Sequence, residues 1–149
     1  MIKHGAKMIQ ALTNAKVPQV TIMCGASFGA GNYGMCGRAF APRFVFAWPN
    51  AKSAVMGGEQ AAATMAIVAE AGAKRRGTVL DRDALEREKA EIVANFERQA
   101  GAIHTTSLLL DDGIIDPRDT RTVLATVLAT CREAEARVVR PVQYGVARL

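Results

Sequence analysis

Gly25-Ala26-Ser27-Phe28-Gly29-Ala30-Gly31-Asn32-Tyr33-Gly34 is the stretch of this chain on which the interpretation of fold and function depends. It directly follows the apolar run Val20-Thr21-Ile22-Met23-Cys24, which predicts a buried strand. Its first five residues match the G-x-S-x-G pattern of a serine nucleophile elbow. Its last six residues match the G-x-G-x-x-G pattern of a dinucleotide-binding loop. The surrounding sequence therefore has to decide between these functions.

The composition is that of one folded domain without a nucleic-acid partner. The 149 residues correspond to about one domain at roughly 100–200 residues each, and the hydrophobic content of 50% is sufficient for a packed core. The formal net charge is +5, but apart from Lys74-Arg75-Arg76 the basic residues are scattered, and aromatic residues make up only 5%. Because neither a basic patch nor an aromatic stacking platform is evident, no nucleic-acid binding is expected.

The cysteines indicate a reducing compartment, and the hydropathy indicates neither a signal peptide nor a membrane span. Cys24, Cys36 and Cys131 cannot all pair, and none stands in a C-x-x-C spacing, so neither a disulfide framework nor a metal site is predicted. The richest apolar window, 61–73, is interrupted by polar residues, and the start of the chain lacks the unbroken apolar stretch of a signal peptide. We expect no membrane association and a cytoplasmic location, with the mitochondrial matrix as the alternative.

Periodicity and chain-breaking residues predict an alternation of helices and strands without a linker or an internal repeat. Buried strands are expected at 20–24, 44–47 and 53–56, and the stretch 25–34 is expected to be a loop. Helices are expected over 2–15, from 57 to about 72, from 81 to about 100, and from 117 to about 136. Asp116 is predicted to cap the last helix, with Pro117 at its first helical position.

The two simple motif interpretations lack their required partners. A nucleophile elbow at Ser27 needs a histidine from a late loop, but the only downstream histidine is His104, near the end of a charged helical stretch. A dinucleotide site needs a carboxylate about 20 residues beyond its glycines. Residues 44–54 contain no Asp or Glu, and the first acid after the stretch, Glu59, falls at a helix start. Both interpretations are therefore disfavoured.

Longer blocks continue the pattern on both sides of these motifs. They are Lys3-His4-Gly5-Ala6-Lys7, residues 29–40, residues 42–44, Ala47-Trp48-Pro49-Asn50-Ala51, residues 55–62, and Asp111-Asp112-Gly113-Ile114-Ile115-Asp116-Pro117-Arg118-Asp119-Thr120-Arg121. Together these blocks resemble the carboxyltransferase beta subunit of biotin-dependent acyl-CoA carboxylases, in particular its methylcrotonoyl-CoA and geranyl-CoA branch. The resemblance covers nearly the whole chain.

The resemblance implies an α/β fold of the crotonase type, in which strand–strand–helix units wind into a superhelix. The predicted order of two strands followed by one helix over 44–72 agrees with this fold. Beta subunits contain two such domains, and this sequence resembles only the later part of the second. We therefore expect a partial domain over residues 1–137 and a C-terminal tail over residues 138–149.

The resemblance also implies the site residues. The backbone amides of Ala30 and Gly31 would stabilise the ureido oxygen of biotin, on which negative charge develops during carboxyl transfer. Phe28, Gly29, Asn32 and Tyr33 would line the biotin site. The segment between Thr21 and Gly37 contains no Asp, Glu, His or Lys. This absence is natural for a site that uses backbone donors and unusual for general acid–base catalysis.

The implied function is one part of a ligase that carboxylates an enoyl-CoA such as 3-methylcrotonoyl-CoA or geranyl-CoA. The implied partners are an acyl-CoA substrate, an alpha subunit that carries biotin carboxylase and biotin, and further copies of the beta subunit. Because the site in this family forms between two different domains, we expect the chain alone to be inactive. The alternative function is that of a non-catalytic crotonase-like interaction module.

Overall fold

The computed structural model describes residues 2–139, 141 and 145 of the chain. Most of the tail expected over 138–149 therefore lies outside the described residues, and the predicted domain boundary at 137 stays a prediction. The chain separates into two compact units, one up to Pro117 and the other from Arg118 onwards. Each unit is described by itself.

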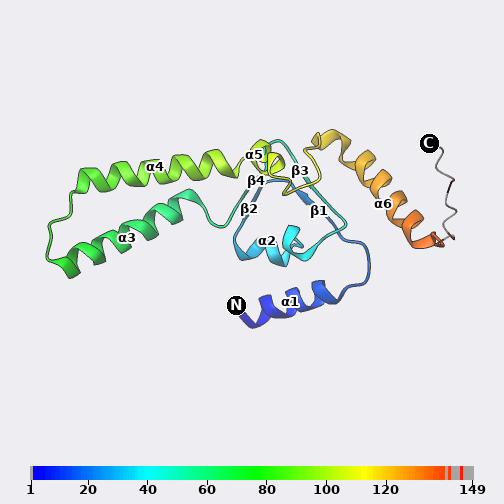
Figure 1. The fold of residues 1–149 in the computed structure, drawn as a ribbon, viewed down its shortest axis with the longest axis horizontal. Coiled ribbons are helices and arrows are strands. Elements are labelled where there is room, and N and C mark those ends of the chain that lie inside the picture. The colour runs from blue at the N-terminus through cyan, green and yellow to red at the C-terminus, as the bar shows by residue number, and fades with distance from the viewer. Residues whose placement is uncertain (1, 140, 142–144, 146–149) are drawn as a thin grey trace. The chain divides into compact units, whose positions relative to one another are not determined.

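Two consecutive strand–strand–helix repeats form the centre of the first compact unit (Figure 1). Their elements are β1 (Val20–Met23), β2 (Ala26–Phe28) and α2 (Ala30–Gly34) in the first repeat, and β3 (Phe44–Ala47), β4 (Lys52–Ala54) and α3 (Gly58–Arg76) in the second. Strand β1 pairs with β3, and β2 pairs with β4, in both cases parallel. Each sheet thus receives one strand from each repeat.

The sequence offset between paired strands differs by two residues between the two sheets. Val20 lies opposite Phe44 and Ala26 lies opposite Lys52, so the offset along the chain is 24 residues in one sheet and 26 in the other. The two additional residues lie in the β3–β4 connection, residues 48–51, where the amide of Ala51 donates to the carbonyl of Trp48 at 2.9 Å. Because this turn absorbs the insertion, the ends of β2 and β4 meet side by side.

A third segment, residues 111–115, extends the β1–β3 sheet on the other side of β3. Ile114 forms a parallel bridge with Ala47. The amide of Ala47 donates to the carbonyl of Gly113 at 3.1 Å, and the amide of Ile115 donates to the carbonyl of Ala47 at 2.9 Å. The block near the C-terminus therefore lies directly beside the block around Phe44, although the two are far apart in sequence.

The remaining helices of the first unit are α1 (Ile2–Asn14), the 3₁₀ turn η1 (Arg38–Phe40), α4 (Arg82–Ala100) and α5 (Ala102–Ser107). Helices α3 and α4 run side by side away from the strands (Figure 1). They approach closely at Gly58, where an added Cβ would lie 3.1 Å from the Cβ of Phe96. The Asp81 carboxylate caps α4 by accepting the amides of Asp83 and Ala84 at 3.0 and 3.1 Å.

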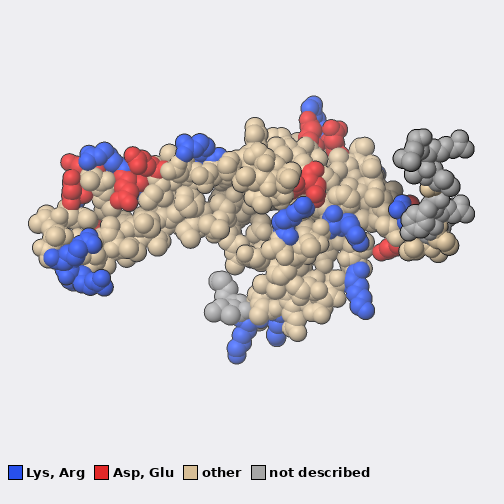
Figure 2. All heavy atoms as spheres, in the orientation of Figure 1, with Lys and Arg blue, Asp and Glu red and all other residues tan. Residues whose placement is uncertain are grey.

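Acidic and basic side chains intermingle along α4, and basic side chains gather at the far end of α3 (Figure 2). The latter are Lys74, Arg75 and Arg76, which occupy the last turn of the helix. Positive charge there complements the carbonyl groups that a helix leaves unpaired at its C-terminus. These three charges therefore stabilise the end of α3.

The hydrophobic core is small and lies where the β1–β3 sheet meets the start of α5. It consists of Met23, Val45, Ala47, Ala51 and Ala102, each at most 9% exposed. Many large apolar side chains remain exposed on the first unit, among them Met65 and Ile67 on α3 and Leu109 after α5.

The second compact unit consists mainly of α6 (Thr120–Ala136), which follows the 3₁₀ turn η2 (Pro117–Asp119). The end of the predicted helix is confirmed, but its start differs. Asp116 precedes a 3₁₀ turn that begins at Pro117, so Asp119, and not Asp116, occupies the N-cap position of the α-helix. Helix ends often tighten into 3₁₀ geometry, which the capping pattern alone does not reveal.

The structure differs from the predicted elements at three other places. The predicted loop 25–34 contains strand β2 and helix α2, because β4 supplies a pairing partner that the local pattern does not show. Strand β4 covers 52–54 rather than 53–56. Helix α3 continues past Gly72 and ends at Gly77, whose φ of +68° allows the left-handed cap that terminates it.

Candidate functional site

Gly29 forms the sharp turn between β2 and α2. Its φ and ψ of 59° and −141° fall in a region that is available almost only to glycine. Its amide donates to the carbonyl of Ala54 at 3.1 Å, and an added Cβ would lie 3.1 Å from the carbonyl oxygen of Val55. Strand β4 therefore fixes the point at which the chain turns into α2.

Ala30 and Gly31 follow this turn with exposed backbones and free amides. Among the described residues, neither amide donates a hydrogen bond, because both precede the first intrahelical bonds of α2. An added Cβ on Gly31 would meet no atom within 4 Å. Packing within the chain therefore does not require glycine at position 31. The two adjacent amides remain available as donors to a ligand.

Asn32 connects α2 to the elements on either side. Its Nδ2 donates to Oγ of Ser27 in β2 at 2.8 Å, and its carbonyl accepts the amide of Gly37 at 2.8 Å. The amide of Cys36 donates to the carbonyl of Tyr33 at 3.2 Å, and Cys36 has a φ of +56°. These bonds form a Schellman motif that ends the helix. The hydroxyl of Thr21 in β1 donates to the Cys36 carbonyl at 2.8 Å and holds the motif against the sheet.

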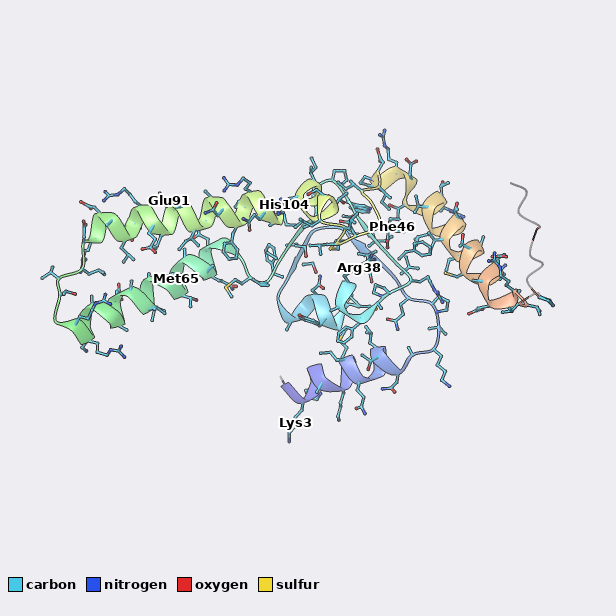
Figure 3. All side chains as sticks on the ribbon, in the orientation of Figure 1. Lys3, Arg38, Phe46, Met65, Glu91 and His104 are labelled. Atoms are coloured by element: carbon cyan, nitrogen blue, oxygen red, sulfur yellow. The ribbon has the colours of Figure 1, made fainter. Side chains whose placement is uncertain are left out.

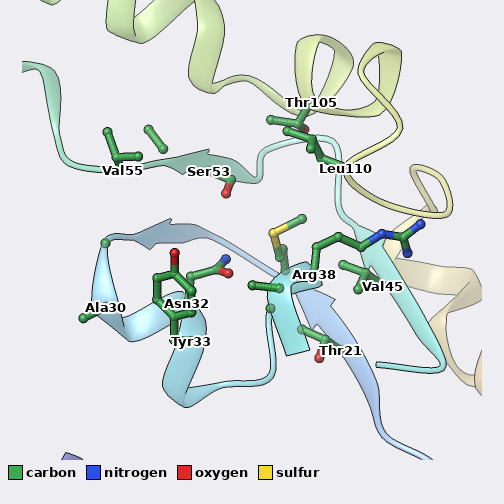
Figure 4. A pocket seen from close by; sticks show the side chains of 15 residues that line it. Thr21, Ala30, Asn32, Tyr33, Arg38, Val45, Ser53, Val55, Thr105 and Leu110 are labelled. Carbon is green, nitrogen blue, oxygen red and sulfur yellow. The ribbon is translucent and has the colours of Figure 1, made fainter. Parts of the chain in front are cut away.

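A cavity of about 500 Å³ lies between the strands and α2 (Figure 4). Its lining is mostly apolar, with a few hydroxyl and amide groups and one cation. The lining residues are Thr21, Met23, Gly29, Ala30, Asn32, Tyr33, Gly37, Arg38, Ala39, Val45, Ser53, Ala54, Val55, Thr105 and Leu110. An apolar cavity with few polar groups suits a flat, uncharged ring system.

Four of the six predicted site residues line this cavity, namely Gly29, Ala30, Asn32 and Tyr33. Ala30 stands at its rim with the methyl group directed away from the middle (Figure 4). The ring of Tyr33 is half exposed and packs edge-to-face on Phe40, with 5.7 Å between ring centroids. Tyr33 is therefore a wall of the cavity and a packing residue at once.

The other two predicted residues do not line the cavity. Gly31 is exposed on the outer side of α2, next to the rim residue Ala30. Phe28 is half buried in β2 and is absent from the lining. In a strand, successive side chains point to opposite faces, so Phe28 and Ser27 face different sides of β2. The contact of Phe28 with biotin stays a prediction.

Several lining residues escaped the sequence interpretation because tertiary structure brings them there. Ser53 stands opposite Ser27 in the β2–β4 pairing, and its hydroxyl is directed into the cavity (Figure 4). Thr105 and Leu110 come from α5 and the segment after it, far along the chain. Ser53 could have been predicted only from the parallel pairing of β2 with β4, and no local sequence pattern predicts that pairing.

The geometry also removes the two simple motif interpretations. Ser27 lies within β2 and accepts a hydrogen bond from Asn32, whereas His104 lies on α5 (Figure 3) and forms no described bond with it. Strand β3 ends at Ala47 and is followed by Trp48, so no carboxylate stands where a ribose would need one. Glu59 lies in the first turn of α3, as expected.

Ionic groups near the cavity are few. Nη1 of Arg38 lies 3.2 Å from Oδ2 of Asp112, so this guanidinium pairs within the chain. Burial raises the pKa of the Cys36 thiol above its ordinary value. All three cysteines are free. Among the described residues, no group of three or more His, Cys, Asp or Glu side chains is arranged to hold a metal ion.

The described helices include none that is both long and apolar enough to cross a membrane. This finding concerns the described residues alone.

Known proteins with the same pattern identify the class. The solved beta subunit of Pseudomonas aeruginosa geranyl-CoA carboxylase superposes with a TM-score of 0.85 at 47% identity, covering 99% of this chain and 27% of that one. The 3-methylcrotonyl-coenzyme A carboxylase beta1 subunit of Mycobacterium tuberculosis is 49% identical over 147 residues, covering 99% of this chain and 27% of its own length. The mitochondrial methylcrotonoyl-CoA carboxylase beta chain of Arabidopsis thaliana is 46% identical over 147 residues, covering 99% and 24%.

The fold is thus that of a carboxyltransferase domain of the crotonase type, which confirms the predicted fold class and family. The family model described as "Carboxyl transferase domain" matches residues 1–143, and the chain belongs to this family. It spans about a quarter of the length of these relatives, namely 24–27%.

Proposed function

We propose that this chain is the biotin-facing part of the carboxyltransferase component of a biotin-dependent acyl-CoA carboxylase. The observation that carries the proposal is the free amide of Ala30 at the rim of an apolar cavity, with the free amide of Gly31 next to it, in a chain of this family. The names of the relatives, which are methylcrotonoyl-CoA and geranyl-CoA carboxylase beta subunits, support the same function.

The residues present fit a biotin ring. The ureido head group is flat and uncharged and offers one carbonyl oxygen as acceptor, while the loop offers two adjacent donors and the cavity wall is mainly apolar. Carboxybiotin, when bound, supplies the carboxyl group that is transferred. Removing one donor of such a pair typically slows a reaction by roughly a hundredfold to a thousandfold.

The part of this chain is to hold that oxygen with fixed donors. The donors of Ala30 and Gly31 are backbone groups, so they need no side-chain rearrangement when charge develops. Helix α2 has only five residues, so the macrodipole contributes little and the two hydrogen bonds carry the stabilisation. Gly29 orients the pair, since no other residue adopts its backbone conformation without strain.

Substrate and partners follow from the relatives as proposals. The substrate is an enoyl-CoA such as 3-methylcrotonoyl-CoA or geranyl-CoA, and biotin arrives on an alpha subunit or carrier domain. Further beta-subunit copies complete the assembly. Turnover is expected only where a domain that binds the acyl-CoA is present. The cytoplasm is the proposed compartment, with the mitochondrial matrix as the alternative.

Grafting tests the function directly. This chain replaces the 147 aligned residues of the M. tuberculosis beta1 subunit, with which it is 49% identical, and carboxylation of 3-methylcrotonoyl-CoA is measured with the matching alpha subunit. Activity that Gly31→Val abolishes supports the proposal. Gly5→Val is the matched control, because Gly5 is also an exposed helical glycine whose added Cβ meets nothing within 4 Å.

The alternative function, a non-catalytic interaction module, predicts the opposite result. An assembled graft that carries out no carboxylation, together with an isolated chain that binds no biocytin at millimolar concentration, would favour the module.

A further inference from the structure

The side chain of Asn32 is held on both sides. Its Nδ2 donates to Oγ of Ser27 at 2.8 Å, and its Oδ1 occupies the position where a Cβ of Gly37 would lie, 1.6 Å from that point. Its carbonyl accepts the amide of Gly37 at 2.8 Å. Because the carboxamide is enclosed between β2 and the end of α2, it turns toward a ligand only by giving up the bond to Ser27.

The loop that carries the free amides is therefore fixed at its two ends. At one end the amide of Gly29 donates to the carbonyl of Ala54, and at the other end Asn32 is bonded to Ser27. The amides of Ala30 and Gly31 lie between these points and donate no bond among the described residues, although the carbonyl of Gly31 accepts the amide of Met35 at 3.1 Å. A donor pair stabilises developing charge best when the protein holds it in place before the ligand arrives.

We propose that Asn32 is a positioning residue that fixes the Ala30–Gly31 donor pair through Ser27, and that it does not itself bind biotin. This inference rests on the proposed function, and it replaces the direct contact that the resemblance implied for Asn32. Ser27, which matches a nucleophile motif in the sequence, instead accepts the hydrogen bond that holds the Asn32 side chain.

The test is a biocytin titration of the ¹⁵N-labelled chain, followed through the amide resonances of Ala30 and Gly31. The variants are Asn32→Ala, Ser27→Ala, and both together. Each single variant is expected to weaken biocytin binding about tenfold, as for the loss of one well-formed hydrogen bond. The double variant is expected to bind no more weakly than either single one, because both act through the same bond.

Two further variants separate positioning from general loss of stability. Ser27→Thr keeps the hydroxyl and is expected to restore binding. Asn50→Ala removes another asparagine side-chain bond, from Nδ2 to the carbonyl of Cys24 at 3.2 Å, outside the cavity lining. Its biocytin affinity is expected to equal that of the unaltered chain. In the absence of ligand, the backbone order parameters of Ala30 and Gly31 should fall in Asn32→Ala but not in Asn50→Ala.

The possible results are distinct. If the unaltered chain shows no shift of these two amides with biocytin, the proposed function is wrong and the inference falls with it. If it binds and Asn32→Ala binds equally well, only the inference is wrong. If Asn32→Ala weakens binding while Ser27→Ala does not, Asn32 contacts the ligand directly, and the proposed positioning through Ser27 is refuted.

Discussion

Val45 and Asp112, which are 67 positions apart in sequence, are joined by two hydrogen bonds that run in opposite directions. The amide of Val45 donates to Oδ2 of Asp112 at 2.8 Å, and the amide of Asp112 donates to the carbonyl of Val45 at 2.6 Å. Arg38 adds an ion pair to the same carboxylate at 3.2 Å. The carboxylate of Asp112 thus connects the segment 111–115 to the central strand β3 and to the 3₁₀ turn after α2.

Removal of the Asp112 carboxylate is expected to destabilise the fold more than removal of the Arg38 guanidinium. Asp112→Ala leaves the amide of Val45, a residue only 2% exposed, without its acceptor, which costs roughly 1–3 kcal/mol. Arg38→Ala breaks a partly exposed ion pair and costs less than about 1 kcal/mol. Urea unfolding of the two variants measures both changes.

Asp112→Asn is the control for this pair. It keeps an oxygen acceptor for Val45 and loses only the charge, so its stability should lie near that of Arg38→Ala. Equal losses for Asp112→Ala and Asp112→Asn would show that charge, and not the bond to Val45, dominates.

Gly29 and Gly31 are expected to respond to alanine with opposite signs. Gly29→Ala forces a side chain into a φ of +59° and against the carbonyl of Val55, which costs about 1–3 kcal/mol. Gly31→Ala meets no neighbour and should stabilise the chain by up to about 1 kcal/mol, because alanine favours helix. Thermal unfolding measures both, with Gly5→Ala as the reference for an open helical glycine.

Biocytin binding should follow a different order from stability in these variants. Gly31→Ala is expected to weaken binding despite its stable fold, because the added methyl group stands beside the free amides. Unchanged affinity in Gly31→Ala would place the ligand elsewhere.

Gly37→Ala is expected to destabilise the end of α2 by roughly 1–3 kcal/mol through overpacking. Its Cβ would lie 1.6 Å from Oδ1 of Asn32 and 2.9 Å from the carbonyl oxygen of the same residue. In an Asn32→Ala background the first clash disappears and the second remains, so the cost should be smaller but not zero. A thermodynamic cycle from denaturant unfolding of the four proteins measures this coupling.

Additive losses for Gly37→Ala and Asn32→Ala would contradict the enclosure of the Asn32 carboxamide. They would show that the two positions respond independently.

The Cys36 thiol is expected to make the stability fall in alkaline solution. Burial raises its pKa in the folded state, so the unfolded chain loses this proton first as the pH rises. The contribution is fully present below the unfolded pKa of about 8.5 and is lost as the pH rises through the folded pKa. Between about pH 8 and pH 10 the free energy of unfolding should fall less in Cys36→Ala than in the unaltered chain, as measured by denaturant unfolding at each pH.

Alkylation provides the independent measurement. Iodoacetamide at about pH 8 should modify exposed Cys24 well before buried Cys36, as read by peptide mass analysis. Equal rates at the two cysteines would contradict the burial of Cys36.

Much of the fold was predictable because its signals are local. Val20–Met23 and Phe44–Ala47 are short, continuous apolar runs, and Asp81 stands where an N-cap of the following helix is needed. Strand β2 was missed because its three residues, Ala26–Phe28, carry no strand pattern. Their conformation follows from pairing with Lys52–Ala54, which are 26 residues further along the chain.

The sequence by itself determined the family, and the resemblance to that family implied the amides of Ala30 and Gly31 as the proposed donors. The absence of Asp, Glu, His and Lys between Thr21 and Gly37 agrees with backbone donors. Only the tertiary structure decided which glycine is indispensable and what Asn32 does. Gly29 is constrained by the carbonyls of Ala54 and Val55, whereas Gly31 has open space around it. The bond between Asn32 and Ser27 likewise depends on how α2 folds back on β2. Such constraints arise between segments, so no pattern within one segment reveals them.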